Sequence, residues 1–487
     1  MKSDELLDAI GDLPDATVEQ TENLRRGFRT PLWVRVTAAA ACACLTVAAV
    51  GITVTRRGST EPPVSGDISE SESAAPTETT QPTQATKVTA VTKSPGSDAA
   101  CVKILALPQY ATKKMMYKPA YVDGMAAFYK KVTKAFLQGK SGENRVCSPL
   151  NMYFALSMLT EITDGNSRGQ LLKLLGTNDL PTLRERCAAL WDLHYRDGDN
   201  KDTLLLANSL WMANGISYRQ APLDRLATDH HAAAFQGDMG SAGYDRALQE
   251  WINGMTGGLL QEAASDLHMD AATVLTLAST VLLRDQWEAP FRSQFTKDGT
   301  FHAAGGDVTC PFMHHNYQTH CQRGKNYLAV NMPFASNKGG MWLILPDEGV
   351  SVDTLIDAGT PVAVSDIEQI SEYAMVHLSV PKFDVCADLD LREGLRTLGV
   401  TDVFDGAKAD FSPLTDDGAV LGSVKHAARV AADEEGVTAA AYTVEQLAGA
   451  TLPRNEYTFT ADRPFLFAVT GIGSSLLFAG VVEKPLD

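Results

Sequence analysis

A stretch of small residues between an acidic turn and a buried strand most constrains what this chain can fold into. Residues 434–436 read Glu-Glu-Gly, and Val437 opens a run of mostly small side chains that continues to Pro453. Strand-like alternation resumes at Asn455–Phe459, and a buried apolar run follows. Small side chains can enter between existing strands without the roughly 1–3 kcal/mol that overpacking costs. The stretch can therefore be exposed in one state and a strand in another; since Ala is the best helix former, a surface helix over 436–449 is the alternative.

An uncharged segment near the N-terminus predicts a membrane anchor. Val36–Val54 carries no charged residue, and at about 1.5 Å per residue a helix of this length spans the hydrocarbon core of a bilayer. More arginines precede the segment than follow it, which places the N-terminus in the cytoplasm. We therefore expect a cytoplasmic tail over 1–34 and a transmembrane anchor over 35–57, with 36–54 in the membrane.

Two alternatives remain for this anchor, and a linker follows it. A signal peptide that is cleaved, giving a secreted protein, would need an unusually long charged region before its apolar core. Lipidation at Cys42 is the other alternative, but it ordinarily requires a larger aliphatic residue than Ala39 three positions earlier.

From Gly58 the chain is rich in Ser, Thr, Pro, Glu and Gln, a composition that cannot offset the entropy of ordering. We predict a disordered linker over 58–103 and a globular domain over 104–487.

The globular region combines helical and strand periodicities without an internal repeat. Apolar residues at helical spacing predict helices over 120–137, 149–159, 183–193 and 244–255. Strand-like runs occur at 204–212, 274–283, 328–332, 341–345, 375–380, 465–470 and 476–482. Because helices gather early and strands dominate late, the pattern favours an α+β architecture over a regular βαβ alternation.

Short motifs spread over this region carry a family resemblance. They are Asn144–Leu150, Leu206–Trp211, Trp251–Ile252 with Thr256 and Gly258, Gln286–Phe291, Pro333, Leu345–Glu348, Val380–Phe383, Leu395 with Leu398–Gly399, Phe404 and Ala409–Ser412. Each is weak alone. In this order, and followed by Glu434–Ala441 and Arg463–Phe467, they resemble the landmarks of the serpin family over the whole of 104–487.

The resemblance implies a fold and a way of working. The serpin fold has helices and three β-sheets, a five-stranded central sheet and an exposed reactive-centre loop. In the family, a protease forms an acyl-enzyme on the loop, and the freed part of the loop then enters the central sheet as a new strand. The chain would then supply no catalytic residue and would not be an enzyme. Its expected partners are serine proteases, held as a covalent acyl-enzyme complex by a monomeric inhibitor.

The resemblance also assigns the hinge and the bait bond. The hinge residues are Glu434, Gly436, Val437, Thr438, Ala439, Ala440 and Ala441. Val437 replaces the usual threonine, but a β-branched, uncharged side chain suits a strand. The family's spacing places the reactive bond between Ala450 and Thr451. A small residue before the cut suits elastase-like or subtilisin-like proteases. Arg454, a possible trypsin site, follows a proline and lies too far along.

Two further groups of residues match positions that control loop insertion. Lys382 and Glu434 match a salt bridge at the top of the sheet, and Trp287 matches the aromatic residue packed below it. As an exposed ion pair, Lys382 and Glu434 would contribute only about 0–1 kcal/mol. Ser148, Asn208 and His426 match a polar cluster under the centre of the sheet. Ser279 stands where the family has an asparagine, and its shorter side chain puts the usual hydrogen-bond network in doubt.

Other functions find little support in the sequence. No nucleophile elbow, HExxH, Walker or dinucleotide motif is present, so we expect no cofactor. The net charge of −17 disfavours nucleic-acid binding. A cluster of Cys310, His314, His315, His320 and Cys321, expected on a hairpin, lacks any standard zinc spacing, so no metal site is predicted. A Cys310–Cys321 disulfide stays open.

We therefore predict an inhibitory, membrane-anchored serpin of a bacterial type, with its inhibitory domain outside the cell. One rival is a non-inhibitory serpin that acts as a binding module. It predicts clean cleavage of the loop without a trapped complex. The other rival is an inhibitor of papain-like cysteine proteases, which predicts loss of trapping when the thiol of the protease is blocked.

Overall fold

The computed structural model describes residues 102–110, 121, 124–139, 141–197, 202–265, 267–360, 364–437 and 455–486. Its helices are α5 (Ala126–Leu137), α6 (Pro149–Glu161), α7 (Gly165–Leu175), α8 (Leu180–His194), α9 (Gln220–Asp229), α10 (Ala242–Met255), α11 (Gln261–Ser265), α12 (Val352–Ala358), α13 (Val364–Ile370) and α14 (Arg392–Thr397). Short 3₁₀ helices are η1 (Ser293–Phe295), η2 (Asp402–Phe404) and η3 (Ile472–Ser474).

The strands of the described residues form two hydrogen-bonded sheets. They are β1 (Val102–Ala106), β2 (Arg145–Cys147), β3 (Asp202–Ala213), β4 (Ala232–Gly237), β5 (Leu275–Gln286), β6 (Lys297–Ala303), β7 (Gly306–Arg323), β8 (Tyr327–Pro333), β9 (Gly339–Pro346), β10 (Glu372–Pro381), β11 (Phe383–Asp390), β12 (Leu421–Ala432), β13 (Gly436–Val437), β14 (Glu456–Thr460), β15 (Phe465–Gly471) and β16 (Leu476–Val482).

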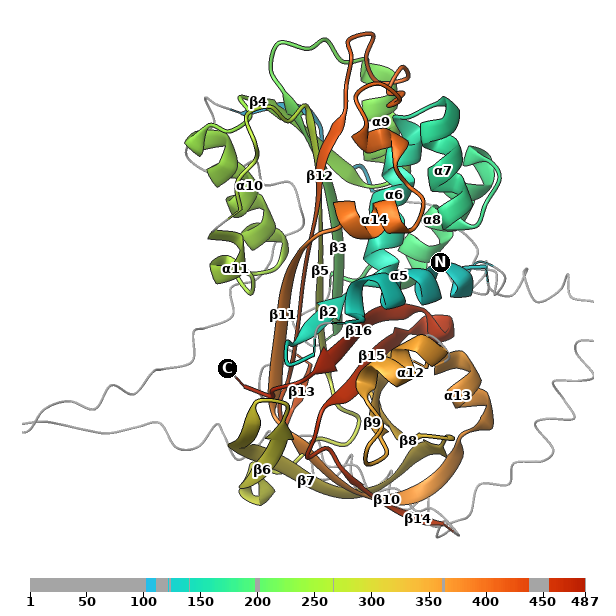
Figure 1. The fold of residues 1–487 in the computed structure, drawn as a ribbon, viewed down its shortest axis with the longest axis vertical. Coiled ribbons are helices and arrows are strands. Elements are labelled where there is room, and N and C mark those ends of the chain that lie inside the picture. Colours follow the sequence, from blue (N-terminus) through green and yellow to red (C-terminus); the bar gives the residue numbers. More distant parts are fainter. Residues whose placement is uncertain are drawn as a thin grey trace, which may run out of the picture. The chain divides into compact units, whose positions relative to one another are not determined.

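The first sheet, called the central sheet below, has the order β1-β4-β3-β5-β13-β12-β11 (Figure 1). Five of its strands, β4, β3, β5, β12 and β11, match the expected five-stranded sheet. The count rises to seven because β1 adds at one edge, antiparallel to β4, and because β13 lies between β5 and β12. Below β13, β5 and β12 pair directly and in parallel, from Leu421 opposite Leu275 to Ala427 opposite Thr280. The central sheet is therefore opened at one end only.

The second sheet has the order β14-β10-β7-β8-β9-β15-β16-β2, with β6 paired to β7. The resemblance implied three sheets, but the structure joins two of them into one network. The join is β7, an 18-residue strand that pairs with β6 and β10 and, near its end, with β8. The α+β architecture predicted from the sequence is confirmed.

The helices cover both faces of the central sheet. Helices α10 and α11 lie on one face, and α5 to α9 with α14 lie on the other (Figure 1). Helix α6 is buried along its whole length and contacts β3, β5 and β16, so it links the two sheets. Along β5 the side chains alternate: Leu277 and Leu283 join the large core, whereas Ala278 joins the smaller core under α10.

Most long periodic segments are confirmed, with boundaries that shift by a few residues. The predicted run at 476–482 coincides with β16, and the helix predicted over 149–159 is α6 with two more residues. All five residues of the Cys/His cluster lie on β7, which forms antiparallel hairpins with β6 and with β8, as expected. Cys310 and Cys321 are free, so the disulfide that the sequence left open does not form. Eleven residues along one strand separate them by roughly 36 Å, far beyond disulfide reach.

In the described part of the chain, no group of three or more His, Cys, Asp or Glu side chains could hold a metal ion. None of the described helices has the length and apolar character needed to cross a membrane. The segment 36–54, on which the anchor was predicted, lies outside the described residues, so that prediction is not tested here.

Candidate functional site: the mouth and the centre of the central sheet

A tight turn brings the start of the predicted hinge into the central sheet. The turn runs from Asp433 to Gly436, where the Asp433 N–H donates to the Gly436 carbonyl at 3.1 Å. The Asp433 carboxylate accepts from the N–H groups of Glu435 and Gly436 at 2.9 and 3.2 Å. The chain then reverses, so Val437 pairs with Ala432 on one side and with Asp285 on the other. Gly436–Val437, at the start of the predicted hinge, is therefore already a short strand.

Gly436 and Val437 fit this place for different reasons. A Cβ on Gly436 would lie 2.1 Å from the carbonyl oxygen of Asp285, so only glycine allows the two backbones to approach this closely. The side chain of Val437 is 1% exposed and joins the large core. The first two residues of the alternative helix over 436–449 are thus strand, and a threonine is not required for this position to insert.

Trp287 supports the turn from below, as the resemblance implied for its position. Its ring is 2% exposed and stacks on Phe334, with 5.6 Å between ring centroids. Its indole N–H donates to the Asp433 carbonyl at 2.8 Å, and its backbone N–H donates to the Glu435 carbonyl at 2.9 Å. Trp287 therefore fixes the turn by packing and by two hydrogen bonds.

Glu434 is held from three directions at the top of the sheet. Its carboxylate pairs with the Lys382 ammonium at 2.8 Å and accepts from the Thr296 hydroxyl at 2.9 Å. Its carbonyl accepts from the Phe291 N–H at 2.8 Å. Burial alone would raise the pKa of Glu434, but the hydrogen bonds from Lys382 and Thr296 lower it below its ordinary value. Because the side chain of Lys382 is 34% exposed, the ion pair contributes orientation more than stability.

The second half of the site lies under the centre of the central sheet and is built on His426 of β12. This imidazole is fully buried, and burial lowers its pKa to about 3, so it is neutral at physiological pH. Its Nε2 accepts a hydrogen bond from the Ser148 N–H at 3.0 Å. The proton must then be on Nδ1, which lies 3.1 Å from Ser279 Oγ and donates to it. His426 therefore connects β12 to β5 and to α6.

Ser148 and Ser279 occupy their places for local reasons. Ser148 is the N-cap of α6: its hydroxyl accepts from the Asn151 N–H at 3.3 Å, and Pro149 follows at the first helical position. Ser279 lies directly opposite His426 in the parallel pairing of β5 and β12. The short side chain of Ser279 does reach the imidazole, so the network that the sequence left in doubt is present here.

Asn208 does not join this hydrogen-bond network. It is buried and lies opposite Ser279 on β3. Neither its side-chain oxygen nor its nitrogen has a hydrogen-bond partner among the described residues. The Ser279 hydroxyl is engaged across the sheet with His426 on β12, and no bond to β3 forms. The structure thus brings Ser148, Ser279 and His426 together by hydrogen bonds, and Asn208 by position alone.

The bait itself lies outside the described residues. This applies to Thr438, Ala439, Ala440 and Ala441 of the hinge and to the reactive bond Ala450–Thr451. The described chain resumes at Asn455, and β14 then runs parallel to β10 at the edge of the second sheet. Both ends that flank the predicted loop are therefore fixed in the fold, one in each sheet.

Sequence reasoning missed several residues of the site. Asp433, Phe334 and Thr296 hold the turn, and Asp285 lies opposite Val437. An Asp three residues before a Gly is a signature of a type I turn, and that signal over Asp433–Gly436 could have been found.

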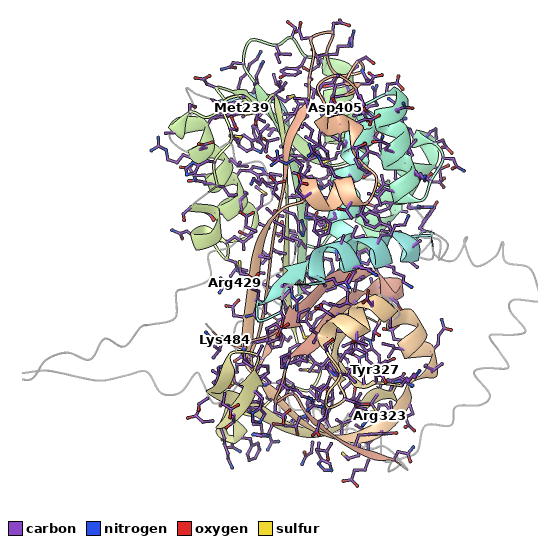
Figure 2. The ribbon with its side chains drawn as sticks, in the orientation of Figure 1. Met239, Arg323, Tyr327, Asp405, Arg429 and Lys484 are labelled. Atoms are coloured by element: carbon purple, nitrogen blue, oxygen red, sulfur yellow. The ribbon has the colours of Figure 1, made fainter. Side chains whose placement is uncertain are left out.

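Arg429 of β12, labelled in Figure 2, was also missed: it pairs with Asp384 of β11 and donates to the Leu259 carbonyl at 2.6 Å. The partners of these residues are distant in sequence, so no local pattern marks them.

Comparison with known proteins identifies the family. Residues 123–485 match the family described as Serpin (serine protease inhibitor). This chain belongs to the serpin family, and membership supports protease inhibition as the general class of function. A relative described as putative serpin-Z12 of Oryza sativa subsp. japonica is 29% identical over 375 residues, which cover 72% of this chain and 87% of the relative.

Solved structures agree on the fold. The native state of the thermophilic serpin tengpin superposes with a TM-score of 0.70 at 24% identity, over 78% of this chain and 97% of that one. Human thyroxine-binding globulin, in complex with its hormone, gives a TM-score of 0.67 at 20% identity, over 75% of this chain and 100% of that one. At these identities the likeness shows the fold and nothing more.

Proposed function

We propose that this serpin is an irreversible, suicide-type inhibitor of extracellular serine proteases of the elastase-like or subtilisin-like kind. One observation carries the proposal: Gly436–Val437 already lies between β5 and β12, in the place where an inserted loop would continue. The residues that come next, Thr438 to Ala441, are small and uncharged. The sheet is open at its top, and the sequence that would enter it is suited to a strand.

The chemistry belongs to the target protease. Its serine hydroxyl attacks the Ala450 carbonyl, the Ala450–Thr451 peptide bond breaks, and the new amino group of Thr451 leaves with the proton. Ala450 is then held as an ester on the protease. Once the loop is cut, residues 438–450 are free to follow Val437 into the sheet and draw the attached protease along before water hydrolyses the ester. No catalytic group of this chain takes part.

The observed register fixes where each inserted residue would lie. Continuing the antiparallel pairing of Val437 with Asp285 places Tyr442 opposite Thr280, and continuing that with Ala432 places it beside Ala427. By strand alternation, Tyr442 would then face α10, where Ala427 and Ala278 leave a surface of small side chains. The large side chain of Tyr442 would therefore lie on the face of the sheet toward α10, where its neighbours are small.

The same register places Thr443 between Ser279 and His426. These two residues are direct partners while β5 and β12 pair in parallel. Insertion as far as Thr443 must break the hydrogen bond from His426 to Ser279, and the Thr443 hydroxyl is positioned to replace it. The hydrogen bond between His426 and Ser279 thus resists opening of the sheet. Once Thr443 has inserted, its hydroxyl would restore the lost hydrogen bond.

The energetics favour the inserted state. Insertion exchanges one short parallel pairing for two antiparallel ladders, and roughly a dozen added hydrogen bonds at about 0.5–1.5 kcal/mol each amount to the order of 10 kcal/mol. The buried, β-branched side chain of Val437 suits its place in the strand. This release is large enough to act against a bound protease.

A membrane anchor over 36–54, with the serpin domain outside a bacterial cell, belongs to the same proposal. It is supported by the uncharged segment, by the excess of arginines before it, and by the Ser/Thr/Pro-rich linker of 58–103. A tethered inhibitor would act on proteases that reach the cell surface. Protease added to intact cells tests this orientation. Digestion of the serpin domain supports a location outside the cell, and protection of the domain contradicts it.

The test incubates the purified full-length protein with an elastase and uses denaturing gels and mass spectrometry. The proposal expects an SDS-stable adduct and a released fragment that begins at Thr451. Cleavage at this bond without an adduct would support the non-inhibitory rival, and an adduct with a papain-like protease alone would support the other. An intact loop in the presence of elastase and subtilisin would overturn the proposed specificity.

Two adjacent substitutions provide a matched control. Ala439→Glu would place a carboxylate on the face of Val437, between the core residues Leu283 and Val430. Ala440→Glu would place the same group on the opposite face, beside Arg429. We expect Ala439→Glu to be cleaved without forming the adduct and Ala440→Glu to retain most of it. Equal behaviour of the two variants would contradict the proposed register.

A further inference from the structure

A buried carboxyl group lies beside the inserted hinge and has no part in the function argued so far. Asp285 is 1% exposed, although it carries an ionisable side chain near the end of β5. It is the residue directly opposite Val437, and Asp202 lies opposite it on the other side, on β3. Cross-strand partners share a face of the sheet, so the two carboxyl groups and Val437 point to the same side.

The groups around Asp285 leave its charge poorly balanced. Its Oδ1 accepts from the Gln286 N–H at 3.0 Å, and its Oδ2 accepts from the Ser336 hydroxyl in the turn between β8 and β9. The nearby cations are engaged elsewhere: Lys338 and Arg196 both pair with Asp202. Arg284, its neighbour along β5, alternates to the other face. On the hinge side its cross-strand partner is the apolar Val437.

The pKa of Asp285 follows from this setting. Burial has the largest effect and raises it; hydrogen bonds from Ser336 and the charge of Arg196 lower it, the charge of Asp202 raises it, and the net result is about 6. If β13 left the sheet, water would reach this end of β5, and the pKa would return toward the ordinary value near ~3.9. The protonated form therefore favours β13 in the sheet, and the ionised form favours β13 out of it.

We propose that Asp285 is a positioning residue for the hinge, whose buried carboxyl makes the insertion of Gly436–Val437 between β5 and β12 depend on pH. This inference rests on the proposed function for its biological meaning, because insertion of these residues is the first step of trapping. It does not need a protease to be tested. The hinge is held most firmly below about pH 3.9, the ordinary pKa of an aspartate; this preference is lost as the pH rises to about 6 and changes no further above it.

The experiment measures hydrogen–deuterium exchange of residues 433–437 in the intact full-length protein at pH 5.0 and 7.5. Asp285→Asn keeps the shape of the side chain but cannot ionise. The ratio of wild-type to variant exchange rates cancels the direct effect of pH on exchange chemistry. We expect a ratio of roughly 10 at pH 5.0 and roughly 100 at pH 7.5, because the preference for the inserted hinge falls about tenfold per pH unit between the two pKa values and is constant above the higher one. A ratio that is equal at both pH values would overturn the inference.

Two further variants separate positioning from a structural role. Ser336→Ala removes the hydroxyl that stabilises the ionised form, so the midpoint of the exchange profile should move to higher pH; an unmoved or lowered midpoint would overturn the inference. Asp388→Asn is the control, because Asp388 is an exposed carboxyl in the same sheet, on β11 and away from β13. It should leave the pH dependence of hinge exchange unchanged, and a change equal to that of Asp285→Asn would overturn the assignment to Asp285.

The same samples distinguish this inference from the proposed function. A covalent adduct with elastase together with a pH-independent exchange ratio would remove the role of Asp285 and leave the inhibitor intact. A pH-dependent ratio without an adduct at any pH would keep the hinge switch and overturn the inhibitory function. The two results are read on separate measurements, so neither failure can be mistaken for the other.

Discussion

Ser279 Oγ of β5 and His426 Nδ1 of β12 lie 3.1 Å apart, across the two strands that β13 separates at their upper end. This hydrogen bond lies at the same level as the direct parallel pairing of the strands. It is therefore the side-chain contact that a strand growing downward from Val437 would have to break. The stability of the closed sheet should depend on it.

Ser279→Ala tests the strength of this contact. The substitution leaves the Nδ1–H group of His426 buried without an acceptor, which should lower the free energy of unfolding by about 1–3 kcal/mol. Urea unfolding followed by circular dichroism measures the change. Ser423→Ala is the control, since Ser423 contacts Thr276 across the same two strands at 3.3 Å but is only half-buried. A loss in the control as large as in Ser279→Ala would show that the His426 contact is not special.

His426 should make the stability of the domain fall in acid. Burial lowers its pKa to about 3, whereas a histidine in the unfolded chain titrates near ~6.5. Between these values the unfolded state binds more protons, so the contribution of the neutral imidazole is complete above about pH 6.5 and is lost as the pH falls. At pH 5 the loss is about 2 kcal/mol.

His426→Gln removes the titrating group and tests this sign. The destabilisation caused by His426→Gln should be about 2 kcal/mol smaller at pH 5 than at pH 7.5 in urea unfolding. His314→Gln, at an exposed position of β7, should show no such difference. If the effect of His426→Gln is the same at both pH values, the imidazole does not stay neutral in the folded protein.

A buried carboxylate far from the hinge should respond to acid in a different range. Glu161 at the end of α6 accepts two hydrogen bonds from Arg184 of α8, both at 2.7 Å, and lies 3.2 Å from His230 after α9. Burial raises the pKa of Glu161, but these partners lower it to about 2. Its stabilisation is present above about pH 4.5 and is lost as the pH falls toward 2.

Glu161→Gln should destabilise the domain by about 2–4 kcal/mol at pH 7, less than a fully buried pair because Arg184 is one-third exposed. The difference from wild type should shrink at pH 3. Glu393→Gln is the control, because Glu393 pairs with Arg396 at an exposed site and should change stability by less than about 0.5 kcal/mol. A destabilisation that is as large at pH 3 as at pH 7 would contradict the low pKa.

Sequence reasoning located the elements of this site better than their contacts. The predicted strand at 274–283 and the motif at Gln286–Phe291 led directly to β5 and Trp287, since both are marked by continuous local patterns. The pairing of His426 with Ser148 joins residues 278 positions apart. The resemblance could mark both as parts of one cluster, but not the tautomer or the direction of each hydrogen bond, which depend on packing.

The state of the hinge was not predictable for a similar reason. Glycine and small side chains made Gly436–Val437 compatible with a loop and with a strand alike. These residues form a strand because they fill the gap between β5 and β12. Asp285 lies just beyond the predicted strand at 274–283 and became informative only once the register placed Val437 beside it. Segments that fit two environments are resolved by tertiary structure rather than by local propensity.

The register of β13 yields a last prediction, which concerns the cleaved protein. Insertion as far as Thr443 places its hydroxyl between Ser279 and His426, so Thr443→Val should weaken the cleaved form by about 1 kcal/mol and leave the intact form unchanged. Thr438→Val is the matched control, because strand alternation turns residue 438 to the opposite face. The thermal unfolding midpoint is measured for each of the two variants, once intact and once after cleavage within 448–454. A lower midpoint for cleaved Thr443→Val alone supports the register, since only that variant removes a partner of His426. Equal midpoints for the two cleaved variants would show that insertion follows another register or stops short of the centre of the sheet.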